Sequence, residues 1–411
     1  MEIPCNYISK REGGRSACRR NRRKPSWRAA LVLSAVATLG LAACSSSSSK
    51  SSSPSSATPS PSRSTEGNSI NLRAAQTAVA AAEQPPSFAA PGPTFNAKAA
   101  AGKTLWVINI TSSIPLVQVT DSAAAQALGL VGARLVQYDG KGTVATQSAG
   151  IDEAIAQHAS AIALFAIDPN AVAGPVQKAM QAGIPIIVMQ YGDPGATMPF
   201  GLKAQVTYCY SCAGKYMADY IVANAGTNKT SVALIESTEV PNSKFEIQGF
   251  KSTYLSLCPS CSLYEQNVPV ADWQTQIPTL TQSLIRSHPG LKYIVPIYDG
   301  MALFVVPAVH SAGAATSVKV VSFNATLGVM QDLASHNVVA ADVGSPQAWE
   351  GWALADQFLR VVTGHAPVVQ ETAGLRLFDA SNINSIDLSK PESTWYGVDF
   401  ESVYKRIWGL G

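Results

Sequence analysis

The sequence is poor in charged residues, in histidine and in long apolar runs. Asp, Glu, Lys and Arg make up 14% of the 411 residues, and there are five histidines. It contains no Gly-x-Ser-x-Gly, His-Glu-x-x-His or phosphate-binding glycine motif. These absences argue against an enzyme, although Glu236 and Glu239 follow a predicted strand and stay open as acids near a cleft. The apolar run over 29–41 is too short for a transmembrane helix and is typical of an export signal.

The net charge separates the first 43 residues from the rest of the chain. Residues 1–43 hold nine Lys and Arg and two Asp and Glu, which contribute +7 to the total of +3, so the remainder carries −4. A net negative body lacks the basic surface that nucleic acid needs, and we expect no nucleic-acid partner.

The beginning of the chain has the parts of an exported, membrane-anchored protein. Leu41-Ala42-Ala43-Cys44 closes the basic and apolar leader. It resembles the lipobox of bacterial lipoproteins, which implies a diacylglycerol on Cys44 and a lipid-anchored protein outside the cytoplasm. The following stretch, nearly all Ser, Pro, Thr and Lys, cannot bury enough apolar area to fold. We therefore predict a signal peptide over 1–43, a disordered tether over 44–70 and an N-terminal extension over 71–102.

The rest of the sequence alternates apolar strands with helical segments. Strands are predicted over 104–110, 134–138, 161–167, 185–189, 205–208, 231–235, 262–268, 291–297, 318–323 and 338–343. Such alternation predicts an α/β fold with parallel sheets and right-handed crossovers. Because the pattern stops and restarts, we expect two lobes with a cleft between them. We assign 103–205 with about 346–374 to lobe 1, and 206–345 with about 375–411 to lobe 2.

The stretch 271–301 carries the strongest signal for a binding site. Trp273 precedes one helix, and the apolar strand 291–297 ends in Tyr298-Asp299 before another. Ligands of parallel sheets bind outside the carboxyl ends of the strands, so we expect these three residues in one pocket wall. The structural alternative is that Trp273 is core and Asp299 an N-cap.

Short segments of both lobes together resemble the sugar-type periplasmic binding proteins. These segments are Gln147 with Ile151, Asp168-Pro169, Ala182 to Ile187, Gly249-Phe250, Ala271-Asp272-Trp273, His288-Pro289, Asp299 to Ala302 and Val320 to Asn324. The resemblance covers about 103–377. It implies the type 1 periplasmic-binding fold, in which two Rossmann-like lobes joined by three crossovers close on a small solute. It also implies delivery of the solute to the permease of an ABC importer, by a monomer without a cofactor. A ligand sensor that signals to a membrane partner, such as a histidine kinase, would have the same sequence features.

The sequence departs from this family at the positions that usually bind sugar hydroxyls. Gln190-Tyr191 replaces the usual Asp-Arg, Tyr298 replaces an Asn, and Asn324 replaces an Asp. A neutral, less hydroxylated solute with a ring is therefore as compatible as a pentose. The candidate solute contacts are Ser112, Ser113, Leu116, Gln190 and Tyr191 in lobe 1, and Glu246, Trp273, Tyr298, Asp299, Asn324 and Ser345 in lobe 2.

Two Cys-x-x-Cys pairs invite a comparison with a zinc ribbon. The pairs are Cys209 with Cys212 and Cys258 with Cys261, and 45 residues separate them. Ribbon pairs usually lie about 15–20 residues apart, and an exported protein meets an oxidising environment. We therefore predict two local disulfides and no metal.

Overall fold

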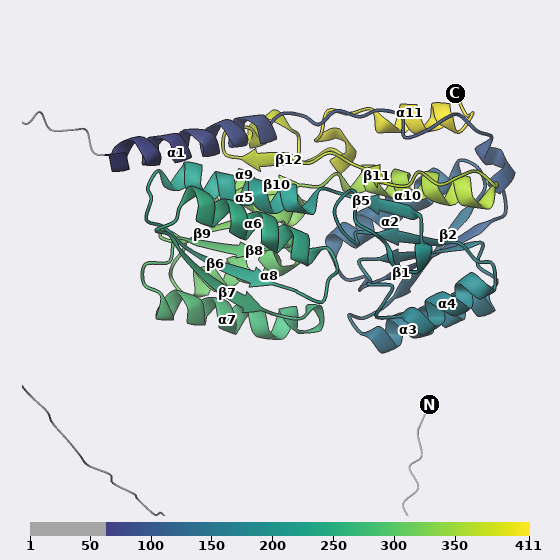
Figure 1. Ribbon diagram of the computed structural model, residues 1–411, viewed down its shortest axis with the longest axis horizontal. Helices are drawn as coiled ribbons and strands as arrows, with labels where there is room; N and C mark the ends of the chain where they lie inside the picture. The colour runs from purple at the N-terminus through teal and green to yellow at the C-terminus, as the bar shows by residue number, and fades with distance from the viewer. Residues whose placement is uncertain (1–62) are drawn as a thin grey trace, which may run out of the picture. The chain divides into compact units, whose positions relative to one another are not determined.

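The computed structural model describes the backbone of residues 63–411 and the side chains from residue 71 (Figure 1). The predicted signal peptide, most of the predicted tether and Cys44 lie outside these residues. Helix α1 (Arg63–Ala82) begins within the range predicted as tether. The Ala-rich second half of this helix has high helical propensity, and helix formation is cooperative, so it extends toward residue 63.

Two six-stranded sheets form the cores of the two lobes. The lobe 1 sheet has the strand order β11-β5-β4-β3-β1-β2 and the lobe 2 sheet the order β12-β10-β9-β8-β6-β7. Every strand pairs in parallel except β12 with β10. The lobe 1 strands are β1 (Thr104–Asn109), β2 (Arg134–Asp139), β3 (Ala161–Phe165), β4 (Ile186–Met189), β5 (Ala204–Thr207) and β11 (Glu371–Thr372). The lobe 2 strands are β6 (Ser231–Glu236), β7 (Ser262–Asn267), β8 (Tyr293–Pro296), β9 (Lys319–Asn324), β10 (Val339–Gly344) and β12 (Arg376–Asp379).

Helices cover both faces of each sheet, which is why the central strands are apolar throughout. In lobe 1 these helices are α2 (Pro115–Gly129) with α10 (Gln347–Val362) and, on the other face, α3 (Val144–Ala156) with α4 (Ala173–Gln181). In lobe 2 they are α5 (Tyr210–Ala225) with α6 (Ser243–Leu257) and, opposite, α7 (Trp273–Ser287) with α8 (Asp299–Ser311), followed by α9 (Leu327–Ala334). Gly214 and Gly249 let α5 and α6 touch, because a Cβ at either would overlap the backbone of the other helix.

Three crossovers join the lobes. The chain passes from β5 to α5, from β10 to α10 and from β11 to β12, so each sheet receives one strand from the late part of the chain. This arrangement confirms the predicted fold class of two parallel-sheet lobes with a three-crossover hinge. Among residues 63–411, no helix is long and apolar enough to cross a lipid bilayer.

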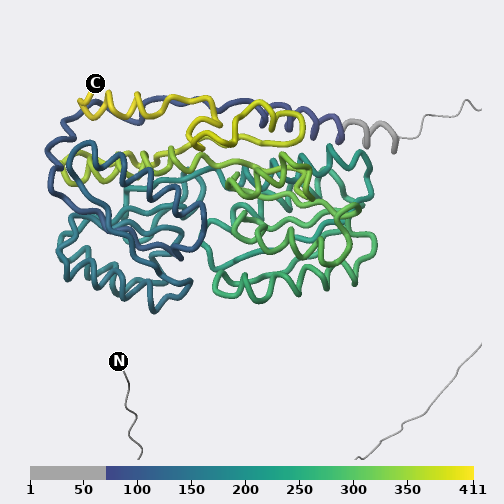
Figure 2. Tube along the Cα trace, turned by 180° about the vertical axis from the view of Figure 1, so that it is seen from behind, coloured from purple at the N-terminus to yellow at the C-terminus, as the bar shows by residue number. Residues whose placement is uncertain are grey.

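The two ends of the described chain add a brace on the hinge side, which we define as residues 83–97 and the C-terminal helix α11 (Phe400–Ile407). Helix α1 packs on α5 of lobe 2, and the following residues cross to lobe 1 beside the C-terminal segment (Figure 2). Arg376 donates one hydrogen bond to the carbonyl oxygen of Glu83 (2.9 Å) and another to that of Trp395 (2.7 Å). The backbone N–H of Phe95 donates to the carbonyl oxygen of Ile407 (2.7 Å).

Helix α11 lies against α10 of lobe 1, although the sequence analysis assigned 375–411 to lobe 2. Trp408, which directly follows α11, stacks on Trp352 of α10 with ring centroids 5.3 Å apart. Its indole N–H donates to the buried carboxylate of Asp356 (2.7 Å). The apolar side of α11 therefore packs on lobe 1. The pattern of strands and helices in the sequence did not predict this contact.

Candidate functional site

A cavity of about 30 Å³ lies where the carboxyl edges of the two sheets face each other, and both lobes line it. Its lining is mostly apolar: Ile110, Ile114, Leu116, Val117, Phe165, Ala166 and Gln190 come from lobe 1, and Val240, Val270, Trp273, Tyr298 and Asn324 from lobe 2. We call it the inner cavity. Five of the predicted contacts therefore meet there: Leu116, Gln190, Trp273, Tyr298 and Asn324. A wider hollow of about 470 Å³, lined by Ser113 among others, shares Ile114, Val270 and Trp273 with it.

Three strand ends that line the inner cavity have strained backbones. Ala166 after β3 has φ 55°, Gln190 after β4 has φ 54°, and Asn324 at the end of β9 has φ 134°. Residues with a Cβ avoid positive φ, at a cost of about 1–3 kcal/mol each. Strain of this kind gathers at binding sites, where the fold holds side chains in a fixed direction. Its coincidence with the cavity supports the location of the site.

Gln190 is the polar residue of the lobe 1 wall, and a buried carboxyl group positions it. Its amide nitrogen donates to both carboxyl oxygens of Glu350 on α10 (2.9 and 3.1 Å). Burial raises the pKa of Glu350 to about 8. Among the described residues, no group donates to the amide oxygen of Gln190, which leaves this acceptor for a solute.

Trp273 begins α7 and presents its ring to both the inner cavity and the outer hollow. Its indole N–H is already bonded, to the hydroxyl of Ser237 (2.7 Å) and the carbonyl oxygen of Val268 (3.1 Å). Gly300 lies against the ring, where a Cβ would overlap it. The sequence left open whether Trp273 is part of the core or of the pocket wall. In the structure it is both, because its indole N–H is bonded within lobe 2 and its ring faces the cleft.

Tyr298 has its polar group held within lobe 2. Its hydroxyl donates to the side-chain oxygen of Asn242 (3.2 Å) and lies 2.7 Å from the hydroxyl of Ser243. The ring, with its polar end fixed, forms part of the cavity wall.

Asp299 is fully buried behind the cavity and does not line it. One of its carboxyl oxygens accepts hydrogen bonds from the backbone N–H (2.6 Å) and the hydroxyl (2.8 Å) of Thr326, just before α9. The neighbouring carboxyl of Asp342 accepts from the N–H of Ala325 (2.9 Å). Burial raises the pKa of both acids, and the charge of Asp299 raises that of Asp342 further. This pair holds the turn that carries Asn324.

Four other predicted contacts lie outside the cavity lining. Ser112 accepts a hydrogen bond from Asn109 (3.2 Å), and the ring of Tyr191 lies beside Lys244, 5.7 Å from its ammonium nitrogen. Ser345 sits behind Asn324, whose amide nitrogen donates to its hydroxyl (3.4 Å). Glu246 is fully buried, and burial raises its pKa well above the ordinary value.

Most of the apolar lining was missing from the sequence-based prediction. Ile110, Phe165 and Ala166 stand at the carboxyl ends of β1 and β3, but they lie inside the predicted strands 104–110 and 161–167. The strand-end rule selects residues that follow a predicted strand, so it did not select these three. Val240 lies in a loop and Val270 begins a short 3-10 helix, and the sequence held no comparable signal for them.

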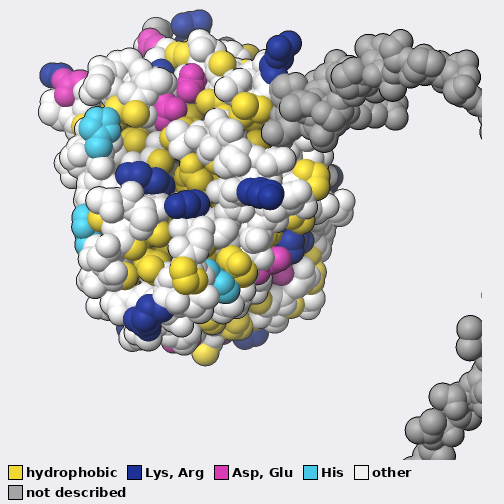
Figure 3. Space-filling model, turned by 90° about the vertical axis from the view of Figure 1, so that its left-hand side faces the viewer, with side chains coloured by type: hydrophobic (Ala, Val, Ile, Leu, Met, Phe, Trp, Pro, Cys, Tyr) yellow, Lys and Arg dark blue, Asp and Glu magenta, His cyan; other side chains and the backbone are white. Residues whose placement is uncertain are grey.

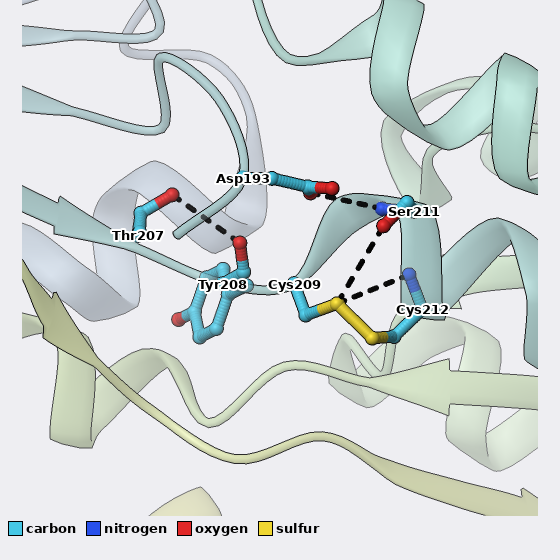
Figure 4. The surroundings of a disulfide bond; sticks show 6 residues. All are labelled: Asp193, Thr207, Tyr208, Cys209, Ser211 and Cys212. Carbon is cyan, nitrogen blue, oxygen red and sulfur yellow. Dashed lines mark hydrogen bonds between the residues drawn. A yellow bond between two sulfur atoms is a disulfide. The ribbon is translucent and has the colours of Figure 1, made fainter. Parts of the chain in front are cut away.

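Both predicted disulfides are present in the structure. Cys209–Cys212 lies at the crossover from β5 to α5, where the backbone N–H of Ser211 also donates to the carboxylate of Asp193 in lobe 1 (3.0 Å; Figure 4). Cys258–Cys261 closes the end of α6, so the two pairs lie at opposite ends of the α5–α6 layer. The part of the chain that the structure describes has no cluster of three or more His, Cys, Asp or Glu able to hold a metal ion.

Comparisons with known proteins agree with this geometry. A family model described as "Periplasmic binding protein domain" matches residues 106–366. The ABC transporter periplasmic-binding protein YphF of Escherichia coli K12 is 26% identical over 250 residues, which cover 57% of this chain and 72% of that protein. The ribose import binding protein RbsB of Salmonella typhimurium is 24% identical over 237 residues, covering 57% of this chain and 76% of its own.

Solved structures of ABC-transporter solute-binding proteins share the fold. One from Thermotoga lettingae, a 5-methylthioribose transporter solute-binding protein in complex with 5-methylthioribose, superposes with a TM-score of 0.65 at 12% identity and covers 79% of this chain and 99% of its own. Another, from Actinobacillus succinogenes with bound D-allose, has a TM-score of 0.61 at 20% identity and covers 69% of this chain and 100% of its own.

Proposed function

The chain belongs to the periplasmic binding protein family, a family of binding proteins and not of enzymes, and we propose that it captures a small solute for an ABC importer. The observation that carries this proposal is the inner cavity, to which both lobes contribute at their carboxyl edges. A solute held there bridges the lobes, so only the closed arrangement makes every contact, and binding shifts the hinge toward closure.

The small volume of the inner cavity indicates that the cleft must open before a solute can bind. A cavity of about 30 Å³ has room for roughly two water molecules. A sugar-sized solute therefore requires the lobes to separate about the three crossovers and to close around it with a wider cavity than this one. The names of the relatives, which include ribose import proteins, support a sugar or a sugar-like compound.

We further propose that the solute is neutral, has an apolar face and carries few hydroxyl groups. Of the polar groups that line the cavity, Tyr298, Trp273 and Asn324 are hydrogen-bonded within lobe 2, and Glu350 holds the amide nitrogen of Gln190, whose oxygen is left as the acceptor. A ligand hydroxyl that finds no partner costs about 1–3 kcal/mol on burial. An apolar substituent instead gains about 25 cal/mol for each Å² that it buries. The 5-methylthioribose in the Thermotoga lettingae structure is a solute of this kind.

Binding is tested by a thermal-shift screen of the purified protein against sugars, polyols, deoxy- and thio-substituted pentoses, nucleosides and small aromatic metabolites. We expect a neutral compound with an apolar substituent to raise the melting temperature in proportion to log concentration, as ligand linkage requires. A screen in which only charged compounds stabilise the protein would contradict the proposal.

We propose that the protein acts while attached to a membrane through lipid on Cys44. The support is the motif Leu41-Ala42-Ala43-Cys44 together with the Ser- and Pro-rich stretch that follows it. In cells that express the full chain, Cys44→Ser should move the protein from the membrane fraction to the soluble fraction and remove its lipid label. A Cys44→Ser protein that keeps both the label and the membrane location would refute lipidation at this residue.

A further inference from the structure

The amino end of the lobe 2 sheet carries a row of lysines on neighbouring strands. Lys229 stands two residues before β6, Lys292 directly before β8, and Lys319 begins β9. The backbone N–H of Lys319 donates to the carbonyl oxygen of Lys292 (2.8 Å), and that of Lys292 to the carbonyl oxygen of Ser231 (3.0 Å). The three lysines therefore lie side by side along one edge, which we call the lobe 2 lysine edge.

The charges of the lobe 2 lysine edge are not neutralised within the described chain. Lys229 and Lys292 are exposed and Lys319 is half-buried. None of the ion pairs between described residues involves them. Figure 3 shows this end of lobe 2, with a band of basic side chains across its middle.

The helix that leads toward Cys44 starts at the same end of the lobe. Asn71 and Leu72 of α1 share a small surface hollow with the loop 226–228, next to Lys229. The chain that follows α1 reaches the hinge, where Glu83, the first residue of the brace, accepts a hydrogen bond from Arg376. Helix α1 thus runs from the lysine edge to the hinge. At 1.5 Å per residue, its first residue, Arg63, lies about 12 Å beyond Asn71, away from the hinge.

The proposed lipid anchor would keep the lobe 2 lysine edge within reach of a membrane. Only 18 residues separate Cys44 from Arg63, a span of at most about 65 Å when fully extended. Lobe 1 also has lysines at the amino end of its sheet, among them Lys103 before β1 and Lys203 before β5, but no anchored helix begins there. The lysines alone do not distinguish the lobe 1 end from the lobe 2 end. The position of α1, which begins at the lobe 2 end, favours lobe 2 as the side near the membrane.

We propose that the lobe 2 lysine edge rests on the anionic lipid surface to which Cys44 is anchored. This inference depends on the lipid anchor proposed above. The chain after residue 43 has a net charge of −4, so an anionic membrane repels the body as a whole and attracts its basic edge. The two effects together would hold lobe 2 near the membrane and leave lobe 1 free to move about the hinge.

The test measures the labelling of lysines on the lipidated full chain in vesicles. The protein is reconstituted in phosphatidylcholine with or without phosphatidylglycerol and exposed to a membrane-impermeant amine reagent, and each lysine is then quantified by mass spectrometry. Lys98, Lys103 and Lys203 are matched controls, since all three are exposed lysines of lobe 1. We expect anionic vesicles to slow labelling of Lys229, Lys292 and Lys319 by roughly fivefold. The controls should not change.

Two further measurements separate the docking from the anchor: lysine labelling at high salt, and the retention of the protein on vesicles. At 1 M salt the Debye length falls to about 3 Å, so the protection should disappear while the protein stays bound through its lipid. Equal labelling of both lysine groups in anionic vesicles, with the protein retained, would overturn the docking and leave the anchor intact. Wild-type protein that does not stay on vesicles at all would overturn the anchor, and the docking with it.

Discussion

The two walls of the cleft are built on different plans. The lobe 1 wall is mainly aliphatic, and its one amide, on Gln190, is positioned by Glu350 from the hinge helix α10. The lobe 2 wall contains the rings of Trp273 and Tyr298 beside two valines and Asn324, and the polar atoms of both rings are bonded to their own lobe. Lobe 1 therefore offers shape and one acceptor that depends on the hinge, whereas lobe 2 offers a rigid ring surface. The difference teaches that a polar residue at a strand end can support the wall, as Asp299 does, without lining the cavity.

The largest effect is expected at Trp273, because it is the ring that both hollows share. Trp273→Ala should weaken solute binding at least tenfold through lost apolar contact, and should cost about 3–5 kcal/mol of stability. Calorimetry with the best compound from the thermal-shift screen measures the affinity. Trp106→Ala, a buried Trp in β1 that lines neither hollow, is the matched control and should lose stability only.

If Trp273→Ala does not fold, Trp273→Phe keeps a ring and removes the hydrogen bond to Ser237. We expect it to fold and to bind severalfold more weakly than the wild type, because the smaller ring covers less of the solute. Wild-type affinity in both Trp273 variants would place the binding surface elsewhere.

Asp299 tests whether a carboxylate at a strand end is a support. Asp299→Ala leaves the N–H and hydroxyl of Thr326 without their acceptor, which should cost about 1–3 kcal/mol of stability by chemical denaturation. Because this turn carries Asn324, we also expect binding to weaken about tenfold. Thr326→Val is the companion variant: it loses only the hydroxyl bond and should lie between Asp299→Ala and the wild type in both measurements. Unchanged stability in Asp299→Ala would contradict the supporting role.

The hinge carboxyl of lobe 1 makes stability depend on pH. Burial raises the pKa of Glu350 from 4.5 to about 8, so between these values the folded chain keeps a proton that the unfolded chain has lost. Stability must then fall as pH rises through this window, by up to about 1.4 kcal/mol per pH unit from this group. Glu350→Gln cannot ionise and should make the fall between pH 5 and 8 less steep, while buried acids such as Glu236 and Glu392, with pKa values raised to about 7, keep the rest of the slope. A profile that rises with pH in the wild type, or is equally steep in the variant, would refute this account.

The smallest effect is expected at the hydroxyl of Tyr298. Tyr298→Phe removes a group that bonds only to Asn242 and Ser243 among the described residues, and should cost about 1 kcal/mol of stability. Its ring remains in the wall, so affinity by calorimetry should stay within about twofold of the wild type. A tenfold loss would show that the hydroxyl turns to the solute and would remove the contrast between the two walls.

The sequence predicted the fold well because each strand is a short apolar run with a helical pattern after it. The same rule found Gln190, Tyr298 and Asn324 at the cavity, since all three follow strands at the carboxyl edge. It could not tell that Asp299 turns toward Thr326, because side-chain direction depends on neighbours that are distant in sequence. It also missed the docking of α11 on lobe 1, which depends on the match between Trp408 and Trp352.

The central claim is that the cleft favours an apolar face over a full set of hydroxyl groups. Its most direct test is calorimetry of the wild-type protein with ribose, 5-deoxyribose and 5-methylthioribose under one set of conditions. We predict that the deoxy and methylthio compounds bind about tenfold more tightly than ribose, because the lining has one free acceptor, on Gln190, and a further hydroxyl left without a partner costs about 1–3 kcal/mol. Tighter binding of ribose than of both analogues would contradict the claim.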